Sequence, residues 1–156
     1  HYRFDYKKIF ERFGDEYRII IKHHPHVNNE PVIENEYKDR VIDLSKNEEL
    51  NELLFVTDIL ITDYSSVIFE AALLDIPMLF YAFDLDEYIS RRGFYCEYIS
   101  FIPGKLVENM DEIIDALMVG NFEADKIIEF KKDFFDDLDG KSGKRASEFI
   151  KRLMKN

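Results

Sequence analysis

Three of the chain's four histidines lie within four positions, directly after an apolar run over residues 17–21. They are His23, His24 and His26, and Lys22 precedes them. At the end of a strand, a lysine and imidazoles can offer positive charge to a phosphate or a proton to a leaving group. A histidine-rich surface turn is the alternative. A metal site is less favoured, because no cysteine is near and neighbouring strand side chains point to opposite faces.

A second polar segment consists of Thr62, Asp63, Tyr64, Ser65 and Ser66, between two apolar stretches. The first backbone N–H groups of a helix have no partner inside the helix and lie at the positive end of its dipole. If a helix begins here, these N–H groups and the serine hydroxyls can hold a phosphate. A serine that only caps the helix is the alternative. One cap does not account for the whole polar run, so an anion site is favoured.

Glu70 stands one turn after Ser66 in an otherwise apolar helical pattern. This i, i+4 spacing places both on one face, where a carboxylate can accept hydrogen bonds from ribose hydroxyls. A carboxylate at the rim of the core is an equal alternative. Arg91 and Arg92 are local positive charge in an acidic chain, and a solvated helix face is the favoured interpretation. Residues 140–144 are not a phosphate-binding loop, because no strand precedes them; we expect a turn and a serine-capped helix.

The composition limits the classes of protein. With 46% hydrophobic and 34% charged residues over 156 positions, the chain is typical of one globular domain. The formal net charge of −11 argues against a general nucleic-acid binder. Cys96 is the single cysteine, which excludes an internal disulfide and favours a reducing setting. Polar residues interrupt the longest apolar stretch, so we expect no membrane-spanning helix. A start at His1 instead of Met predicts missing sequence upstream.

Short apolar runs alternate with helical patterns in the first two thirds of the chain. This alternation predicts an α/β fold with a Rossmann-like parallel sheet and helices on both faces. Ligands of such sheets bind beyond the carboxyl ends of the strands, where both polar segments fall. After Gly104 only helices are expected. The expected strands are residues 17–22, 40–44, 58–62 and 77–81; the expected helices are 4–13, a helix up to 57 with Ser45 and Glu48 as a capping box, 66–74, 107–118, 123–138 and 142–154.

These segments, in this order, resemble the CDP-glycerol glycerophosphotransferase family of teichoic-acid synthesis. The resemblance implies a GT-B-type glycosyltransferase architecture of two Rossmann-type domains, with the active site in the cleft between them. Residues 1–156 would be the single C-terminal CDP-glycerol-binding domain, with C-terminal helices at 107–155, and the N-terminal acceptor domain would be missing. The matching residues are 19–25, 58–70 and 77–81, Asp84 with Tyr88, Arg92 and Gly93 with Tyr95, and Pro103 with Gly104.

The resemblance also implies roles for individual residues. His24 would approach the donor's pyrophosphate and stabilise negative charge as CMP leaves. Ser65 and Ser66 would hold phosphate, and Glu70 would bind the ribose. A second histidine, the base for the acceptor hydroxyl, would belong to the missing domain. No metal or cofactor is expected. Further site residues are Lys22 and His23 for the donor phosphates, although His23 departs from the family's usual string, and Thr62, Asp63 and Arg92 as possible contacts.

The implied reaction is displacement at the β-phosphorus of CDP-glycerol. An acceptor hydroxyl attacks, glycerol phosphate is transferred and CMP leaves. The acceptor would be a teichoic-acid chain or a lipid-linked primer at the cytoplasmic face of a bacterial membrane, and the isolated domain is expected to be inactive. No basic amphipathic helix is evident in the sequence, so we expect membrane attachment through other parts of a longer protein.

Other interpretations stay open. A UDP-sugar glycosyltransferase or an epimerase shares the arrangement of strand, polar turn and helix, and a CDP-ribitol-using relative is a further alternative. A non-catalytic nucleotide-binding or response-regulator-like module would hold magnesium with paired acids at strand ends. Asp58 and Asp63 do not supply such a pair, so this module is disfavoured.

Overall fold

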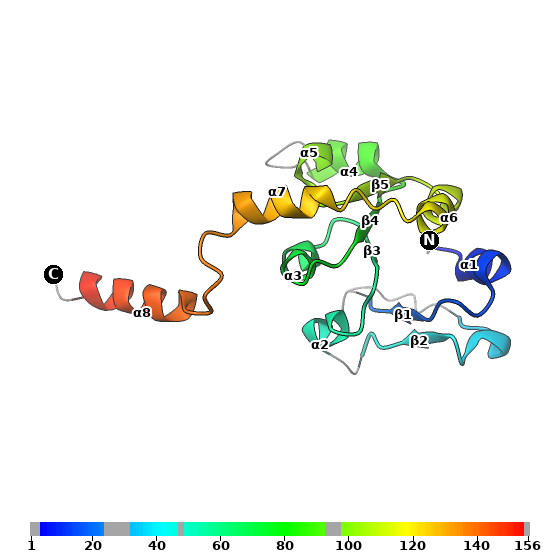
Figure 1. Cartoon of the computed structure of the whole chain (residues 1–156), viewed down its shortest axis with the longest axis horizontal. Coiled ribbons are helices and arrows are strands. Elements are labelled where there is room, and N and C mark those ends of the chain that lie inside the picture. The colour runs from blue at the N-terminus through cyan, green and yellow to red at the C-terminus, as the bar shows by residue number, and fades with distance from the viewer. Residues whose placement is uncertain (1–3, 24–31, 47–48, 93–97, 155–156) are drawn as a thin grey trace.

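The computed structural model describes residues 4–23, 32–46, 49–92 and 98–154, without the side chains of residues 91 and 92. Helical segments separate the strands up to β5, with α4 and α5 both between β4 and β5, and three helices follow β5 (Figure 1). The strands are β1 (Ile19–Ile21), β2 (Val41–Asp43), β3 (Leu60–Thr62), β4 (Met78–Tyr81) and β5 (Lys105–Val107). The helices are α1 (Tyr6–Phe13), a 3-10 turn (Asn35–Tyr37), α2 (Leu50–Leu54), α3 (Val67–Leu73), α4 (Leu85–Arg92), α5 (Tyr98–Phe101), α6 (Met110–Val119), α7 (Asp125–Phe134) and α8 (Ser142–Leu153).

The described strands pair in parallel and form two sheets. β1 pairs with β2, and β4 lies between β3 and β5. The predicted α/β class with parallel strands is therefore confirmed. One sheet was expected, whereas the ladders among the described residues stop between β1 and β3. Ile19 of β1 and Ile61 of β3 instead pack against the same apolar cluster, so side-chain packing joins the two sheets.

β4 lies at the centre of the core, and helices cover both of its faces. Met78, Leu79 and Phe80 are each 0% exposed. Met78 and Phe80 pack in one cluster with residues of α3 and α7, while Leu79 packs in another with residues of α1 and α6. Successive strand side chains point to opposite faces, so this division follows from the alternation along β4. The predicted cover of helices on both faces is confirmed.

The expectation of helices alone after Gly104 is wrong, because β5 follows it directly. Leu79 of β4 lies opposite Lys105, and Tyr81 lies opposite Val107. A strand of three residues that begins with a lysine has little apolar pattern of its own, so its pairing with β4 decides its conformation. A Cβ atom added at Gly104 would lie 2.4 Å from the carbonyl oxygen of Met78. The glycine therefore allows β5 to approach β4.

Two predicted helix caps are also wrong. α2 begins at Leu50 with Glu49 at its N-cap, so Ser45 does not cap it. Ser142 is the first residue of α8, and Lys141 stands at the N-cap position without a side-chain cap hydrogen bond. Both predictions used the preference of serine for N-caps, which is a weak signal when another polar residue lies nearby. The helices themselves are present, with α2 shorter than expected.

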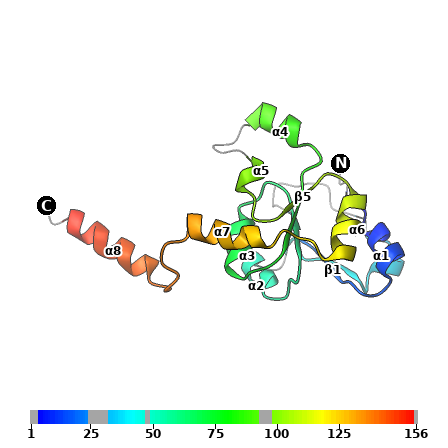
Figure 2. The same ribbon diagram turned by 45° about the horizontal axis from the view of Figure 1, so that its top comes forward.

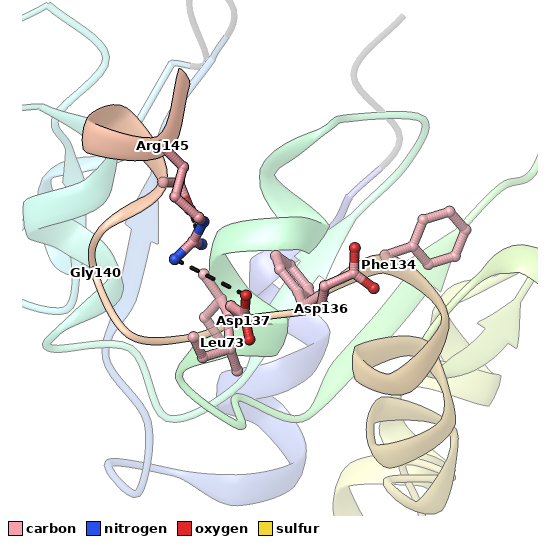
Figure 3. Close-up of a pocket in the computed structure, with 9 residues that line it drawn as sticks. Leu73, Phe134, Asp136, Asp137, Gly140 and Arg145 are labelled. Carbon is pink, nitrogen blue, oxygen red and sulfur yellow. Dashed lines mark hydrogen bonds and ion pairs between the residues drawn. The ribbon is translucent and has the colours of Figure 1, made fainter. Parts of the chain in front are cut away.

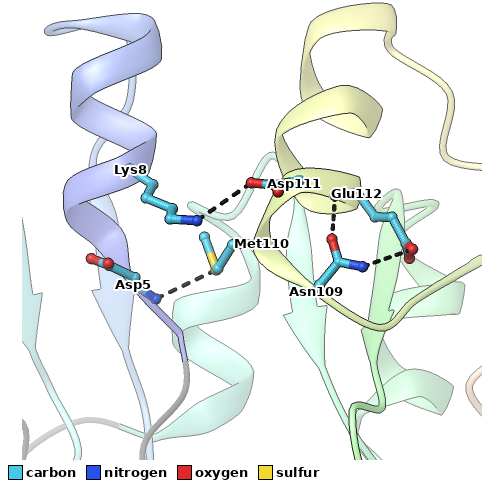
Figure 4. Close-up of polar contacts among 6 residues, drawn as sticks. All are labelled: Asp5, Lys8, Asn109, Met110, Asp111 and Glu112. Carbon is cyan, nitrogen blue, oxygen red and sulfur yellow. Dashed lines mark hydrogen bonds and ion pairs between the residues drawn. The ribbon is translucent and has the colours of Figure 1, made fainter.

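The contact between α1 and α6 joins the first sheet to the second (Figure 4). Lys8 lies 3.4 Å from a carboxylate oxygen of Asp111, and the backbone N–H of Asp5 points at the sulfur of Met110. Asn109 begins α6 as a true cap, since its Oδ1 accepts a hydrogen bond of 3.0 Å from the backbone N–H of Glu112. This cap fixes the start of α6, the helix that covers Leu79.

α8 lies apart from the rest of the molecule (Figures 1 and 2). None of its residues is buried. It is amphipathic, with apolar side chains that include Phe149 and Leu153 and with four basic residues against one acidic residue. The expectation that the chain contains no basic amphipathic helix is therefore wrong. Within the ranges that the structure describes, every helix is too short or too polar to span a membrane.

Candidate functional site

The turn between β3 and α3 presents both predicted serines at the surface. Ser65 and Ser66 are exposed, and neither points into the packed interior. The hydroxyl oxygen of Ser65 accepts a hydrogen bond of 3.3 Å from the backbone N–H of Val67, so Ser65 stabilises the helix start. Ser66 occupies the N-cap position but makes no side-chain cap hydrogen bond. Its hydroxyl is therefore not used by the helix in the way that capping would require.

Glu70 shares the exposed face of α3 with Ser66. Val67 and Ala71, on the other side of the helix, are buried in the core. The predicted placement of Ser66 and Glu70 on one face is therefore confirmed. Its exposure agrees equally with the alternative of a carboxylate that reaches solvent from the rim of the core. Whether Glu70 binds a ribose stays a prediction.

Asp63 shapes the turn through its own backbone and side chain. Its carboxylate accepts a hydrogen bond of 2.7 Å from the backbone N–H of Tyr64. Its carbonyl oxygen accepts one of 3.0 Å from the hydroxyl of Tyr98, which is 4% exposed. Burial, together with the negative charge of Asp63, raises the pKa of Tyr98 above its ordinary value. Thr62 is half-buried at the end of β3, opposite Phe80.

Tyr64 connects this turn to the segment after β4, and no role was predicted for it from the sequence. Its hydroxyl donates a hydrogen bond of 2.7 Å to Asp84. Its ring stacks on Tyr88 of α4 with centroids 3.7 Å apart and lies 5.4 Å from the ring of Tyr98. Burial and the bond to Asp84 raise the pKa of Tyr64 far above its usual value. Asp84 and Tyr88 are among the residues matching the family resemblance, which was the available signal.

The ends of β1 and β2 are tied together by the segment that leads to the histidines. Lys22 donates from Nζ to the carbonyl oxygens of Leu44 and Ser45, over 3.2 and 3.0 Å. The backbone N–H of His23 donates to the hydroxyl of Ser45 over 2.9 Å. Lys22 and His23 thus fix the direction in which the chain leaves β1. Their predicted contacts with donor phosphates stay predictions.

Asp43 anchors the same corner. It accepts hydrogen bonds from the hydroxyl and the backbone N–H of Ser45. Burial by itself raises the pKa of the Asp43 carboxyl, but these two bonds and the positive charges of His23 and Lys46 outweigh it and hold the pKa below its ordinary value. Ser45, predicted as a helix cap, therefore links β2 to the backbone beside the histidines.

Two predicted site residues are not placed by the structure. His24, the predicted catalytic residue, lies outside the described residues. Arg92 ends α4, but its side chain lies outside them too. Their positions relative to residues 62–66, the serine turn, remain expectations. Among the described histidine, cysteine and acidic side chains, no group of three or more is arranged to hold a metal ion.

A separate cavity of about 710 Å³ lies at the far end of α3 (Figure 3). It is lined by Leu73, Phe134 and other residues of the segment that joins α7 to α8. Arg145 forms an ion pair of 3.9 Å with Asp137, which also lines the cavity, and a hydrogen bond of 2.8 Å with Asp139. Because Leu73 is the last residue of α3 and Ser66 precedes its first, this cavity is distinct from the serine turn.

Comparison with known families adds to this geometry. The sequence model of the family described as CDP-Glycerol:Poly(glycerophosphate) glycerophosphotransferase matches residues 1–152. The chain belongs to this family. The match includes both strand ends, the serine turn and α3, so the resemblance first seen in short segments extends over nearly the whole chain.

Similar relatives include bacterial teichoic-acid enzymes. The chain is 44% identical over 153 residues to the teichoic acid poly(ribitol-phosphate) polymerase of Bacillus spizizenii, covering 96% of this chain and 25% of that protein. It is 36% identical over 152 residues to the teichoic acid glycerol-phosphate transferase of Staphylococcus aureus, covering 94% of this chain and 38% of that protein. Both relatives are therefore much longer than the matched region.

Solved structures share the fold. The wall teichoic acid polymerase TagF matches with a TM-score of 0.77 and 30% identity, over 97% of this chain and 38% of that one. A TagF variant soaked with CDPG matches with a TM-score of 0.73 and 28% identity, over 97% of this chain and 39% of that one. The chain thus has an α/β fold similar to that of TagF, and it spans less than two fifths of the length of these relatives.

Proposed function

We propose that this chain is the donor-binding part of a transferase that moves glycerol phosphate from CDP-glycerol to an acceptor hydroxyl in teichoic-acid synthesis. The observation on which the proposal rests is the family match over residues 1–152. The surface position of Ser65 and Ser66 at the start of α3 supports it, because a phosphate can reach hydroxyls and backbone N–H groups there.

The reaction would be a displacement at the β-phosphorus. A bond forms between the acceptor oxygen and that phosphorus, the bond to the bridging oxygen breaks, and CMP departs with the electron pair. Such transfers depend mainly on positioning and on neutralising charge on the phosphoryl oxygens. The diphosphate would be held by Ser65, Ser66, Lys22 and His23. His24 would stabilise the charge on the departing CMP, and Glu70 would accept hydrogen bonds from the ribose. Thr62, Asp63 and Arg92 are possible further contacts.

Replacement of His24 by alanine tests this mechanism in the complete enzyme. Loss of a positioned imidazole is expected to lower turnover by about 10²- to 10⁴-fold, with the melting temperature little changed. Steady-state kinetics and thermal denaturation of the variant measure the two quantities. Full activity in this variant would remove His24 from the mechanism.

A CDP-ribitol donor is the second candidate. The relative at 44% identity is a ribitol-phosphate polymerase, whereas the glycerol-phosphate transferase is 36% identical. CDP-glycerol and CDP-ribitol differ only in the polyol. The residues proposed here contact the nucleotide and the phosphates, which both donors share. The serine turn and Glu70 would serve both donors alike, so the choice between them would be made by residues that touch the polyol.

Residues 1–156 would form one Rossmann-like domain of a GT-B-type enzyme. A partner domain would bind the acceptor, supply the base for its hydroxyl and close the cleft. This chain alone would then bind the donor weakly and transfer nothing. The complete protein would work on the inner face of a bacterial membrane, on a teichoic-acid or lipid-linked acceptor. Attachment was expected through other parts of the protein, and α8 is an additional candidate because it is basic and amphipathic.

Calorimetric titration of the 156-residue chain tests the function. CDP-glycerol and CDP-ribitol are each titrated, and a UDP-sugar serves as the competitor from the nearest rival class. The expected result is binding of at least one CDP-polyol that the UDP-sugar does not displace. Preferential binding of the UDP-sugar would contradict the proposal and favour a sugar-nucleotide enzyme. A difference in affinity between the two CDP-polyols would show that residues of this chain also contact the polyol.

A further inference from the structure

Tyr64, in the middle of residues 62–66, contacts two residues that follow β4. Its hydroxyl donates to Asp84 over 2.7 Å, across 20 positions of sequence. Its ring stacks on Tyr88 at 3.7 Å, with an angle of 22° between the ring planes. Asp84 precedes α4 directly, and Tyr88 lies within it. The turn after β3 is therefore attached to the start of α4 by a hydrogen bond and an aromatic stack.

A second contact joins the turn to α5. Tyr98, the first residue of α5, donates to the carbonyl oxygen of Asp63. It also packs edge-on against Phe80 in the centre of β4. The backbone of Asp63 is thus connected to the core, and the side chain of Tyr64 is connected to α4. Both residues immediately precede Ser65, so they determine the direction in which the two serines leave the strand.

The bond between Tyr64 and Asp84 is of a kind that fixes geometry. A hydroxyl that donates to a carboxylate makes a shorter and stronger bond than one between neutral groups. The stack on Tyr88 restricts the ring to one orientation. A turn held in this way keeps its backbone N–H groups and hydroxyls in place before a ligand arrives, so less ordering is required on binding.

From this geometry we propose that Tyr64 is a positioning residue, held by Asp84 and Tyr88, that presents Ser65 and Ser66 to the phosphates of the donor. The inference rests on the proposed function, because it requires a phosphorylated donor at the serine turn. Tyr64 itself need not touch the donor. Its effect is transmitted through the backbone of the turn, and it should therefore act on the phosphates and not on the nucleoside.

The test compares two ligands of the 156-residue chain by NMR titration, which measures weak affinities. CDP-glycerol contains the diphosphate, whereas cytidine has none. In Tyr64→Phe the ring and its stack remain while the hydrogen bond to Asp84 is lost. The dissociation constant for CDP-glycerol is expected to rise roughly three- to tenfold, which is less than the full effect of one hydrogen bond to a charged group because the loss reaches the ligand only through the backbone of the turn. The constant for cytidine is expected to stay the same.

Partner and control variants complete the test. Asp84→Ala should match Tyr64→Phe, the double variant should be no worse than either, and Asp84→Asn, which keeps an acceptor oxygen, should recover part of the affinity. Tyr6→Phe is the matched control, because it removes a hydroxyl that donates to Val32 on another part of the fold. It should bind both ligands as the unaltered chain does.

The outcomes separate this inference from the proposed function. If the unaltered chain binds neither CDP-glycerol nor CDP-ribitol, the proposed function and this inference both fail. If it binds a CDP-polyol and Tyr64→Phe binds it equally well, only the positioning role fails. Equal weakening of CDP-glycerol and cytidine would show a general loosening of the fold, and would also overturn the role.

Discussion

The two serines at the start of α3 differ in what their hydroxyls do. Ser65 accepts a hydrogen bond from the backbone of Val67, whereas Ser66 makes no cap bond despite its N-cap position. At the residue scale, the two hydroxyls therefore contribute differently to the stability of the turn. Ser65 contributes to the helix start, and Ser66 makes no such contribution.

Alanine variants of the two serines should separate these contributions. Ser65→Ala is expected to lower the free energy of unfolding by about 0.5–1 kcal/mol, as loss of a capping bond does. Ser66→Ala should change it by less than about 0.5 kcal/mol, as an exposed substitution does, yet should weaken CDP-glycerol binding. Urea denaturation and calorimetry measure the two effects. A Ser66→Ala chain that unfolds as easily as Ser65→Ala and binds normally would reverse the assignment.

The carboxyl group of Asp43 should make the stability of the fold depend on pH. Its pKa is held below the ordinary value in the folded chain. A carboxyl of this kind stabilises the fold above its unfolded pKa, and that contribution is lost as the pH falls through the folded pKa. The free energy of unfolding should therefore decrease between pH 5 and pH 3 by less in Asp43→Asn than in the unaltered chain. Equal decreases in the two proteins would show that Asp43 makes no such contribution.

At the scale of elements, the approach of β5 to β4 depends on Gly104. Its added Cβ would meet the carbonyl oxygen of Met78 at 2.4 Å, and that atom belongs to the backbone of the central strand. Gly104→Ala is therefore expected to destabilise the fold by about 1–3 kcal/mol, the usual effect of overpacking. Thermal denaturation measures it as a lower melting temperature.

Gly143 in α8 is the matched control for that prediction. A Cβ added there meets nothing within 4 Å. Gly143→Ala should leave the melting temperature unchanged or raise it slightly, because alanine favours a helix over glycine by about 0.5–1 kcal/mol. A Gly104→Ala chain as stable as Gly143→Ala would mean that β5 can move away from β4 without loss.

The elements that could be predicted from sequence are those whose own pattern decides their structure. The continuous apolar run of β4 predicted a strand buried on both faces, and the spacing of Ser66 and Glu70 predicted one helix face. β5 has no such pattern, since its pairing with β4 decides its conformation. The contact between Tyr64 and Asp84 spans two loops, and no periodicity relates residues 20 positions apart. It could be found only once the strand ends were in place.

At the scale of the whole molecule, the described chain divides into a packed body and a helix outside it. α8 has no buried residue and extends away from the body (Figure 2). α7 is different, because Ile127 and Phe130 are 2% and 4% exposed and belong to the main core. The fold around the serine turn should therefore depend on α7 and not on α8.

Truncation tests this division. A chain that ends at residue 141 loses no buried residue, and the ion pairs that it loses, such as that of Arg145 with Asp139, are exposed and contribute about 0–1 kcal/mol. Its melting temperature should change by no more than about 2–4 °C. A chain that ends at residue 122 also loses Ile127 and Phe130 and should be destabilised by several kcal/mol, since each large buried side chain contributes about 2–5 kcal/mol. Equal loss in both would show that α8 is part of the folding unit.

The central claim is that the donor's diphosphate binds over the start of α3. An NMR titration of the isotopically labelled chain with CDP-glycerol tests it most directly, because every backbone N–H reports its own surroundings. The account predicts that the largest changes occur at the amides of Ser65, Ser66 and Val67 and at those of Lys22 and His23. The account would be contradicted if the amide signals changed mainly at Leu73 and Phe134, around the separate cavity, while those of the two serines stayed the same.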